Sequence, residues 1–174
     1  QQAYSLVYGG ATKAFDLKQE NPRTVAKYGD GLGSQLLVAR RLCEAGCGFV
    51  TVSDCGWDMH ANENSPKFMA GMYPLGGQVD HAVAAFVQDV HERGLEDKIL
   101  LVVTGEMGRT PRINKGGGRD HWGNLTPLVL AGGGLKMGQV IGQSDRQGGQ
   151  AASDPYDPTH LLSTVMHTLF DVAT

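Results

Sequence analysis

The chain has 174 residues, of which 41% are hydrophobic and 19% are charged, and its formal net charge is −3. These values are typical of a globular domain with a sizeable core. The negative balance excludes an electrostatic case for nucleic-acid binding, and the apolar runs are too short to predict a membrane span. The three cysteines, an odd number, argue against a disulfide framework.

The N-terminal part of the chain, residues 1–33, is polar and interrupted by glycines, and we expect it to be a peripheral or linker segment with a short helix over residues 11–17. The main domain is expected to span residues 34–174. Ser34 is a plausible N-cap for a helix through residue 44, with Gly46 as a stop signal.

The rest of the chain alternates between apolar strands and helices. Apolar residues at helical spacing predict a helix over residues 79–90, closed by Gly94, and Asp157 followed by Pro158 opens a final helix. Residues 98–104 form an almost entirely apolar, β-branched run, as expected for a strand buried in a parallel sheet. The other predicted extended segments are residues 48–53, residues 126–131 and a short hairpin arm over residues 136–141.

This order of elements predicts an α/β fold, a sandwich with a mostly parallel sheet flanked by helices. Ligands of such sheets bind beyond the carboxyl ends of the strands. Asp58 and His60 follow the strand predicted to end near Ser53, and Glu106 follows the strand predicted to end near Thr104. The polar clusters therefore lie where a functional site is expected.

Asp58 and His60 are two residues apart, so in an extended segment they project to the same side and can reach one ion. His121 is a natural third ligand, with Glu106 or Asp120 as a fourth. Mixed carboxylate and imidazole ligation suits a divalent metal such as zinc, manganese or iron better than calcium, which prefers oxygen ligands. Each residue alone is more often a surface carboxylate or a hydrogen-bonded histidine, whereas their joint position favours a metal site.

Three arginines accompany these residues: Arg109, Arg112 and Arg119. A guanidinium offers forked donors that match phosphate or sulfate oxygens, which predicts an anion-binding role. The alternative is a structural network in which the arginines pair with Glu106 and Asp120.

Several stretches, in this order, resemble a large bacterial family known as domain of unknown function 1501, a sulfatase-like branch of the alkaline phosphatase superfamily. The resemblance covers nearly everything after about Gly31. The matching stretches are Leu36 to Glu44 (LLVARRLCE), Trp57 to His60 (WDMH), His91 to Leu95 (HERGL), Gly105 to Asn114 (GEMGRTPRIN), Gly118 to Trp122 and Ala131 to Gly138.

The resemblance implies an alkaline-phosphatase-like sandwich and a metal-dependent hydrolase that acts on small sulfate or phosphate esters in the periplasm or outside the cell. Asp58, His60 and His121 would be ligands of one metal, and Glu106 would stand where an aspartate ligand of a second metal usually lies. Met107 follows where the superfamily has histidine, and a thioether cannot replace imidazole for a hard divalent ion. This departure puts the second metal site in doubt.

The nucleophile of the superfamily comes from an N-terminal half, which we expect to precede this chain, since the chain begins without methionine. That missing half would then be a partner of the site. The leading expectation is the C-terminal part of a sulfatase-like hydrolase. The alternatives are a non-catalytic module that binds an anion or a metal, and a phosphomutase with the same metal framework.

Overall fold

The computed structural model describes residues 11–60 and 72–170, so the first ten residues of the predicted peripheral segment lie outside the described residues. The chain divides into two compact units, which we call the helical unit and the strand unit. The helical unit comprises Gln1–Gly56 and Met72–Leu95, and the strand unit comprises Trp57–Gly71 and Glu96–Thr174. The predicted boundary at residue 33 stays a prediction.

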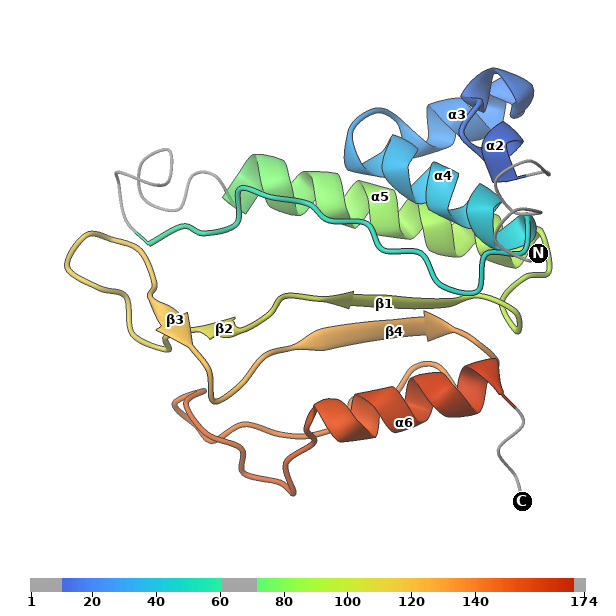
Figure 1. Ribbon diagram of the computed structural model, residues 1–174. Coiled ribbons are helices and arrows are strands. Elements are labelled where there is room, and N and C mark those ends of the chain that lie inside the picture. Colours follow the sequence, from blue (N-terminus) through green and yellow to red (C-terminus); the bar gives the residue numbers. More distant parts are fainter. Residues whose placement is uncertain (1–10, 61–71, 171–174) are drawn as a thin grey trace. The chain divides into compact units, whose positions relative to one another are not determined.

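The helical unit consists of short N-terminal helices followed by two longer ones (Figure 1). The elements are α2 (Ala11–Ala14), the 3-10 helix η1 (Leu17–Gln19), α3 (Pro22–Tyr28), α4 (Leu32–Glu44) and α5 (Met72–Glu92). The helices predicted over residues 34–44 and 79–90 are confirmed as parts of α4 and α5, but the prediction of Ser34 as N-cap is wrong, because α4 begins at Leu32 with Gly31 at its N-cap. None of the helices in the described part of the chain is long and apolar enough to cross a membrane.

Apolar side chains of α4 and α5 form the core of the helical unit, because each helix has an apolar face at helical spacing. Leu37 of α4 and Ala82, Ala85 and Phe86 of α5 are all buried. The turn into α4 depends on Gly33, where a Cβ atom would lie 1.8 Å from the Tyr28 carbonyl oxygen. Only glycine therefore permits this close approach of α3 to the start of α4.

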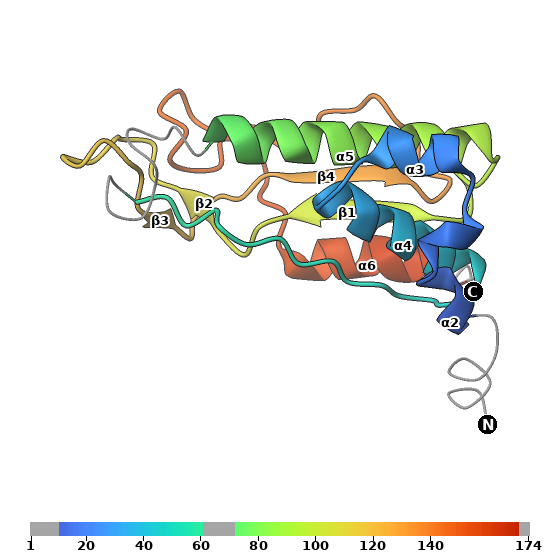
Figure 2. The ribbon, with the colours of Figure 1, turned by 90° about the horizontal axis from the view of Figure 1, so that it is seen from above.

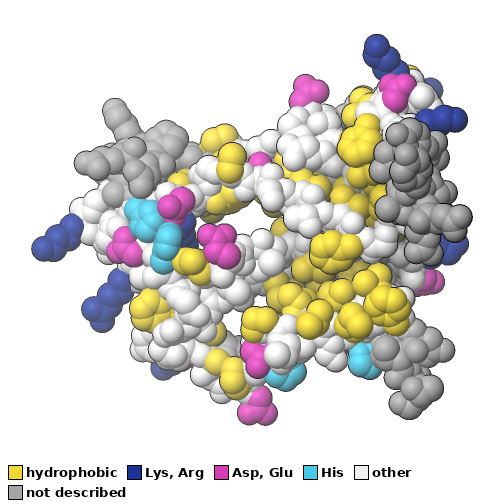
Figure 3. Space-filling view, in the orientation of Figure 1, with side chains coloured by type: hydrophobic (Ala, Val, Ile, Leu, Met, Phe, Trp, Pro, Cys, Tyr) yellow, Lys and Arg dark blue, Asp and Glu magenta, His cyan; other side chains and the backbone are white. Residues whose placement is uncertain are grey.

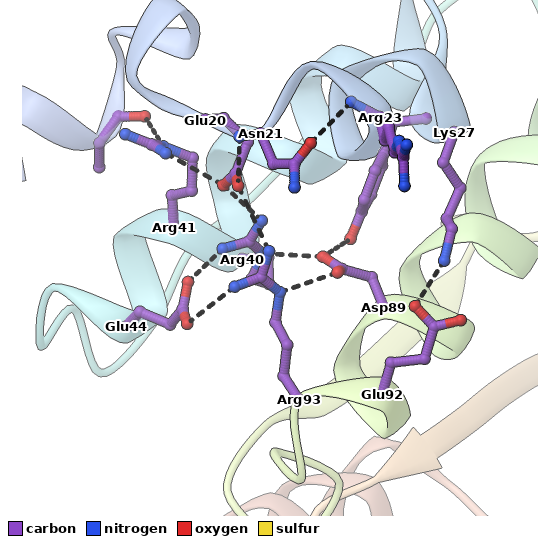
Figure 4. A network of polar contacts seen from close by, with 12 residues as sticks. Glu20, Asn21, Arg23, Lys27, Arg40, Arg41, Glu44, Asp89, Glu92 and Arg93 are labelled. Carbon is purple, nitrogen blue, oxygen red and sulfur yellow. Dashed lines mark hydrogen bonds and ion pairs between the residues drawn. The ribbon is translucent and has the colours of Figure 1, made fainter.

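A buried ion network centred on Arg40 of α4 joins the helices of this unit (Figure 4). Only 1% of the Arg40 side chain is exposed. Its Nη2 lies 2.7 Å from Glu20 Oε2 and its Nε lies 3.0 Å from Asp89 Oδ2 of α5, while Nη1 donates to Glu44. The guanidinium thus pairs with carboxylates from three segments of the chain.

Further donors complete the pairing of the two most buried carboxylates. Asp89 accepts from the Tyr28 hydroxyl at 2.9 Å and from Arg93 Nε at 2.8 Å. Glu20 Oε2 also accepts from Arg41 Nη1 at 3.0 Å. Buried charges are tolerated when they are paired and hydrogen-bonded in this way.

Because of this network, the stability of the helical unit is expected to depend on pH in the acidic range. Burial of Glu20 alone would raise its pKa, but hydrogen bonds from the Asn21 backbone N–H, Arg40 and Arg41 outweigh this effect and lower the pKa from 4.5 to about 2. A carboxyl with a depressed pKa in the folded state stabilises the fold above its unfolded-state pKa, and this contribution is lost as the pH falls through the folded-state value.

We therefore expect Glu20→Gln to lower the melting temperature at pH 7 and to flatten its decline between pH 4.5 and 2, as followed by circular dichroism. Asp80→Asn is the matched control, since Asp80 is an exposed carboxylate of α5. An acid profile of Glu20→Gln as steep as that of the wild type would contradict the assignment.

In its described residues, 57–60 and 96–170, the strand unit contains two small antiparallel sheets and one helix (Figures 1 and 2). In the first sheet β1 (Leu100–Thr104) pairs with β4 (Leu128–Gly132), with Leu100 opposite Gly132 and Thr104 opposite Leu128. In the second, β2 (Gly108–Arg109) pairs with β3 (His121–Trp122). The helix α6 (Pro158–Leu169) begins with the predicted cap, in which Asp157 and His160 form a capping box.

The fold is mixed α/β, as predicted, but the prediction of a mostly parallel sheet is wrong, because both sheets of the described residues are antiparallel. A parallel pair needs a crossover connection, usually a helix. The segment between β1 and β4 instead forms the small β2–β3 sheet, and the chain returns beside β1 in the opposite direction. The prediction that the strand is buried is also wrong, because β1 is half-buried with Thr104 exposed, and Leu128 and Val129 of β4 are exposed. Apolar composition therefore predicted that these segments form strands, and neither their burial nor their direction.

Two shorter extended segments also differ from the prediction. Residues 48–53 form no strand, and residues 136–141 form no hairpin arm. An isolated antiparallel bridge joins Ser144 to Ala151 instead. Strand propensity needs a neighbouring strand to accept its ladder hydrogen bonds, and residues 48–53 pair with none within the described residues.

Candidate metal centre

The segment that carries Asp58 and His60 is anchored by the residue between them. Met59 is 2% exposed, whereas the Asp58 side chain is 64% exposed. A hydrogen bond of 2.8 Å from the Met59 N–H to the Trp57 carbonyl closes a tight turn here. The buried thioether therefore holds the segment while its two polar neighbours are left to face the site.

The third residue, His121, is positioned by the pairing of β2 with β3. Arg109 lies directly opposite His121 in this ladder, so their side chains project from the same face. Gly108, the other residue of β2, is buried, and a Cβ atom there would lie 1.9 Å from the Leu125 carbonyl oxygen. A side chain at this position would push β2 away and displace Arg109.

Asp58, His60 and His121, which we call the ligand triad, bring three ligand atoms together. Asp58 Oδ1 lies 2.8 Å from His60 Nε2 and 2.7 Å from His121 Nε2, and the two Nε2 atoms are 3.0 Å apart. In the space-filling view, histidine and acidic side chains meet at the surface on the left (Figure 3).

The triad fits a transition metal ion. Ligand atoms at the usual zinc distance of about 2.0–2.1 Å in a tetrahedral site are separated by about 3.3 Å, so these three need to move apart by only a few tenths of an ångström. One carboxylate oxygen and two imidazole nitrogens suit zinc or manganese better than calcium. Three protein ligands leave a fourth position for water or substrate, as in catalytic sites.

Asp120 stands behind the triad, beside the other nitrogen of the His60 ring. Its Oδ1 lies 3.2 Å from His60 Nδ1, while Asp58 Oδ1 lies 2.8 Å from Nε2. When Nε2 binds a metal ion, the ring proton is on Nδ1 and can be donated to Asp120, a supporting contact that metal-binding histidines usually have. Asp120 was predicted as a ligand or as an additional supporting residue, and the geometry agrees with the second of these roles.

Both carboxyl groups are held in their ionised form. The pKa of Asp58 is lowered by hydrogen bonds from His121 and Arg109, and the pKa of Asp120 by hydrogen bonds with His60 and Asn114. The two carboxylates are exposed and carry two negative charges at neutral pH, and the Arg109 guanidinium, 2.6 Å from Asp58 Oδ1, offsets one of them, so this group of three side chains keeps a net negative charge. This charge favours capture of a divalent cation.

The three predicted anion-binding arginines have different surroundings. Arg109 donates from Nη2 to Asp58 Oδ1 at 2.6 Å and to the Trp57 carbonyl at 3.1 Å. Arg119 Nη1 donates to the carbonyl oxygens of Thr110 and Pro111 at 2.6 and 2.7 Å, which closes the base of the β2–β3 loop.

Arg112 differs from both. It is exposed and lies three residues after the end of β2 on the same loop, and within the described residues its guanidinium makes no hydrogen bond or ion pair. Of the predicted arginines, it is the one with none of its donors engaged within the described residues. The predicted alternative, a network of the arginines with Glu106 and Asp120, is replaced by the contacts of Arg109 with Asp58 and of Arg119 with the backbone.

Glu106, the remaining predicted ligand, is exposed, and its carboxyl is not part of the ligand triad. It lies between β1 and β2, two residues before β2 begins. Its assignment as a ligand of a second metal therefore stays a prediction.

Asn114 is a residue of the site that the sequence prediction missed. Its amide nitrogen donates to the His60 carbonyl at 2.8 Å and to Asp120 Oδ1 at 3.0 Å. Its oxygen accepts from the backbone N–H groups of Gly116 and Gly118, both at 3.0 Å. The signal was visible in the sequence, because an asparagine before a run of glycines is typical of a side-chain-capped turn.

Comparison with known proteins identifies the family of the chain. A family model described as "Protein of unknown function (DUF1501)" matches residues 1–171. No curated protein and no solved structure matches the chain.

Proposed function

The chain therefore belongs to the DUF1501 family, and on this premise we propose that it is a metal-dependent hydrolase of small sulfate or phosphate esters, of the sulfatase-like branch of the alkaline phosphatase superfamily. The observation that carries the proposal is the ligand triad, whose three ligand atoms lie within 3.0 Å of one another. The triad comes from two segments of the strand unit that are about sixty residues apart in the sequence.

The donor set supports zinc or manganese. A bound ion of this kind polarises an ester oxygen and lowers the pKa of a coordinated water. Asp58 contributes the negative charge, and His60 and His121 contribute neutral nitrogens, so the triad leaves a bound divalent ion with net positive charge. That charge, together with Arg112, favours an anionic substrate over a neutral one.

The ester oxygens have a second recognition element in Arg112. Its guanidinium is exposed and lies on the loop that also carries Asn114 and Asp120. Forked N–H donors match sulfate and phosphate oxygens in geometry and charge. If the chain belongs to this superfamily, as proposed here, the nucleophile would come from a preceding half of a longer protein. The protein would then act in the periplasm or outside the cell.

A second candidate is a non-catalytic module that binds a metal or an anion. Two observations favour it: Glu106 is not part of the ligand triad, and Met107 offers a half-buried thioether instead of imidazole. The two candidates agree on the metal at the triad and differ in turnover.

Hydrolysis of nitrophenyl sulfate and nitrophenyl phosphate separates them, measured on the full natural protein that contains this chain, with and without a chelator. We expect chelator-sensitive hydrolysis and a kcat/KM about 10- to 100-fold lower in Arg112→Ala, since a hydrogen bond to a charged group is worth about 1.5–3 kcal/mol. Arg146→Ala, which removes an exposed guanidinium from another loop of the strand unit, is the control. Bound metal without hydrolysis of either ester would favour the module.

A further inference from the structure

We propose that Asn114 is the positioning residue of the metal centre and that its amide nitrogen sets the orientation of the His60 ring. The inference rests on the proposed metal function of the ligand triad. It concerns a different residue and a different property, namely which nitrogen of His60 faces Asp58 and His121.

The two halves of the Asn114 carboxamide have separate tasks. The oxygen accepts from the N–H groups of Gly116 and Gly118, and the Asn114 backbone N–H donates to the Gly118 carbonyl at 2.8 Å, so the oxygen shapes the loop. The nitrogen contacts no part of this glycine turn. It donates to the His60 carbonyl and to Asp120 Oδ1, which belong to the metal centre.

Through these two bonds the nitrogen holds His60 at two points. The bond to the carbonyl fixes the His60 backbone relative to the loop. The bond to Asp120 Oδ1 fixes the oxygen that lies 3.2 Å from His60 Nδ1. With its backbone and Nδ1 both held, the ring keeps Nε2 toward Asp58 and His121. Supporting contacts of this kind orient metal-binding histidines and raise their affinity for the ion.

Asn114→Asp separates the two tasks. An aspartate keeps an oxygen for the glycine N–H groups, so the loop retains its cap. It replaces the donor by an acceptor that faces two other acceptors, the His60 carbonyl and Asp120 Oδ1, and these repel it. The added negative charge by itself would attract a cation, so weaker metal binding has the opposite sign to a simple charge effect.

The measurement is the dissociation constant for zinc at pH 8, by competition with a chromophoric chelator. We expect Asn114→Asp to weaken zinc binding by about 10- to 100-fold, the usual effect of losing a supporting partner. Asn124→Asp introduces the same charge at an exposed position of the strand unit and is expected to bind within about twofold of the wild type. Wild-type affinity in Asn114→Asp would overturn the inference.

A second readout needs no metal. In the metal-free wild type, carbon-13 relaxation of the His60 ring, assigned with His60→Gln, is expected to show one ordered ring orientation, and Asn114→Asp to show averaging between orientations. A ring as ordered in Asn114→Asp as in the wild type would overturn the inference. If the wild type bound no zinc, the proposed function would fail, whereas the order of the ring would still decide whether Asn114 positions it.

Discussion

Zinc affinity is expected to fall by more than about 100-fold when His121 is replaced by alanine, because losing even a supporting partner of a metal ligand costs about 10- to 100-fold. His121 Nε2 lies 2.7 Å from Asp58 Oδ1 and 3.0 Å from His60 Nε2, so its removal leaves two of three protein ligands. The side chain is 46% exposed, and the fold is therefore expected to tolerate its removal. Isothermal titration with zinc, together with a melting curve of the metal-free protein, tests both statements.

The matched control for this variant is His167→Ala. His167 is an exposed histidine of α6 in the same unit, and its Nδ1 contacts the Ser163 carbonyl and no residue of the ligand triad. It is expected to keep wild-type zinc affinity. If His121→Ala bound zinc as tightly as His167→Ala, the ligand triad would not be the metal site.

The helical unit should lose about 3 kcal/mol of its free energy of unfolding in Arg40→Leu, the lower end of the range for breaking a buried ion pair. Leucine leaves the carboxylates of Glu20 and Asp89 buried without their central cation, and their side chains are only 8% and 5% exposed. The loss stays near the lower end because Arg41 and Arg93 still pair with these carboxylates. Urea unfolding followed by circular dichroism measures the effect.

Two further variants test whether the loss of stability in Arg40→Leu depends on the burial and the geometry of the ion network. Lys27→Ala removes an ion pair with Glu92 whose side chains are 30% and 49% exposed, and it is expected to change stability much less. Arg40→Lys keeps the charge but cannot reach carboxylates on three sides with a single ammonium group, so it should not restore stability. A loss in Arg40→Leu no larger than that in Lys27→Ala would contradict the account.

The chemistry of the candidate site was largely readable from the sequence. The spacing of Asp58 and His60 predicted that they share a side, and His121 was predicted to join them. The structure brings these three together but leaves Glu106 outside the group. The position of Asp120 behind His60 and the bridging role of Asn114 came only from the structure, because they depend on how a loop folds back over residues distant in sequence.

The Arg40 network illustrates the opposite case, in which sequence misleads. A charged residue in an amphipathic helix is normally expected at the surface. Arg40 is instead buried, because Glu20 and Asp89 from two other segments join Glu44, one turn further along α4, in neutralising its charge. No local sequence pattern predicts that carboxylates from distant segments meet at Arg40.

Taken by itself, the sequence determined most of α4, the later part of α5, the cap of α6 and the mixed α/β class, and it pointed to the residues that make up the ligand triad, whereas α3 was not predicted. These depend on neighbours within a few positions, such as Asp157 and His160 in the capping box. Only the tertiary structure decided that β1 pairs antiparallel with β4, that residues 48–53 form no strand, and that Arg109 lies opposite His121. Strand direction and pairing are long-range properties, because they depend on the path of the chain between the strands. Local apolar composition carries no information about that path.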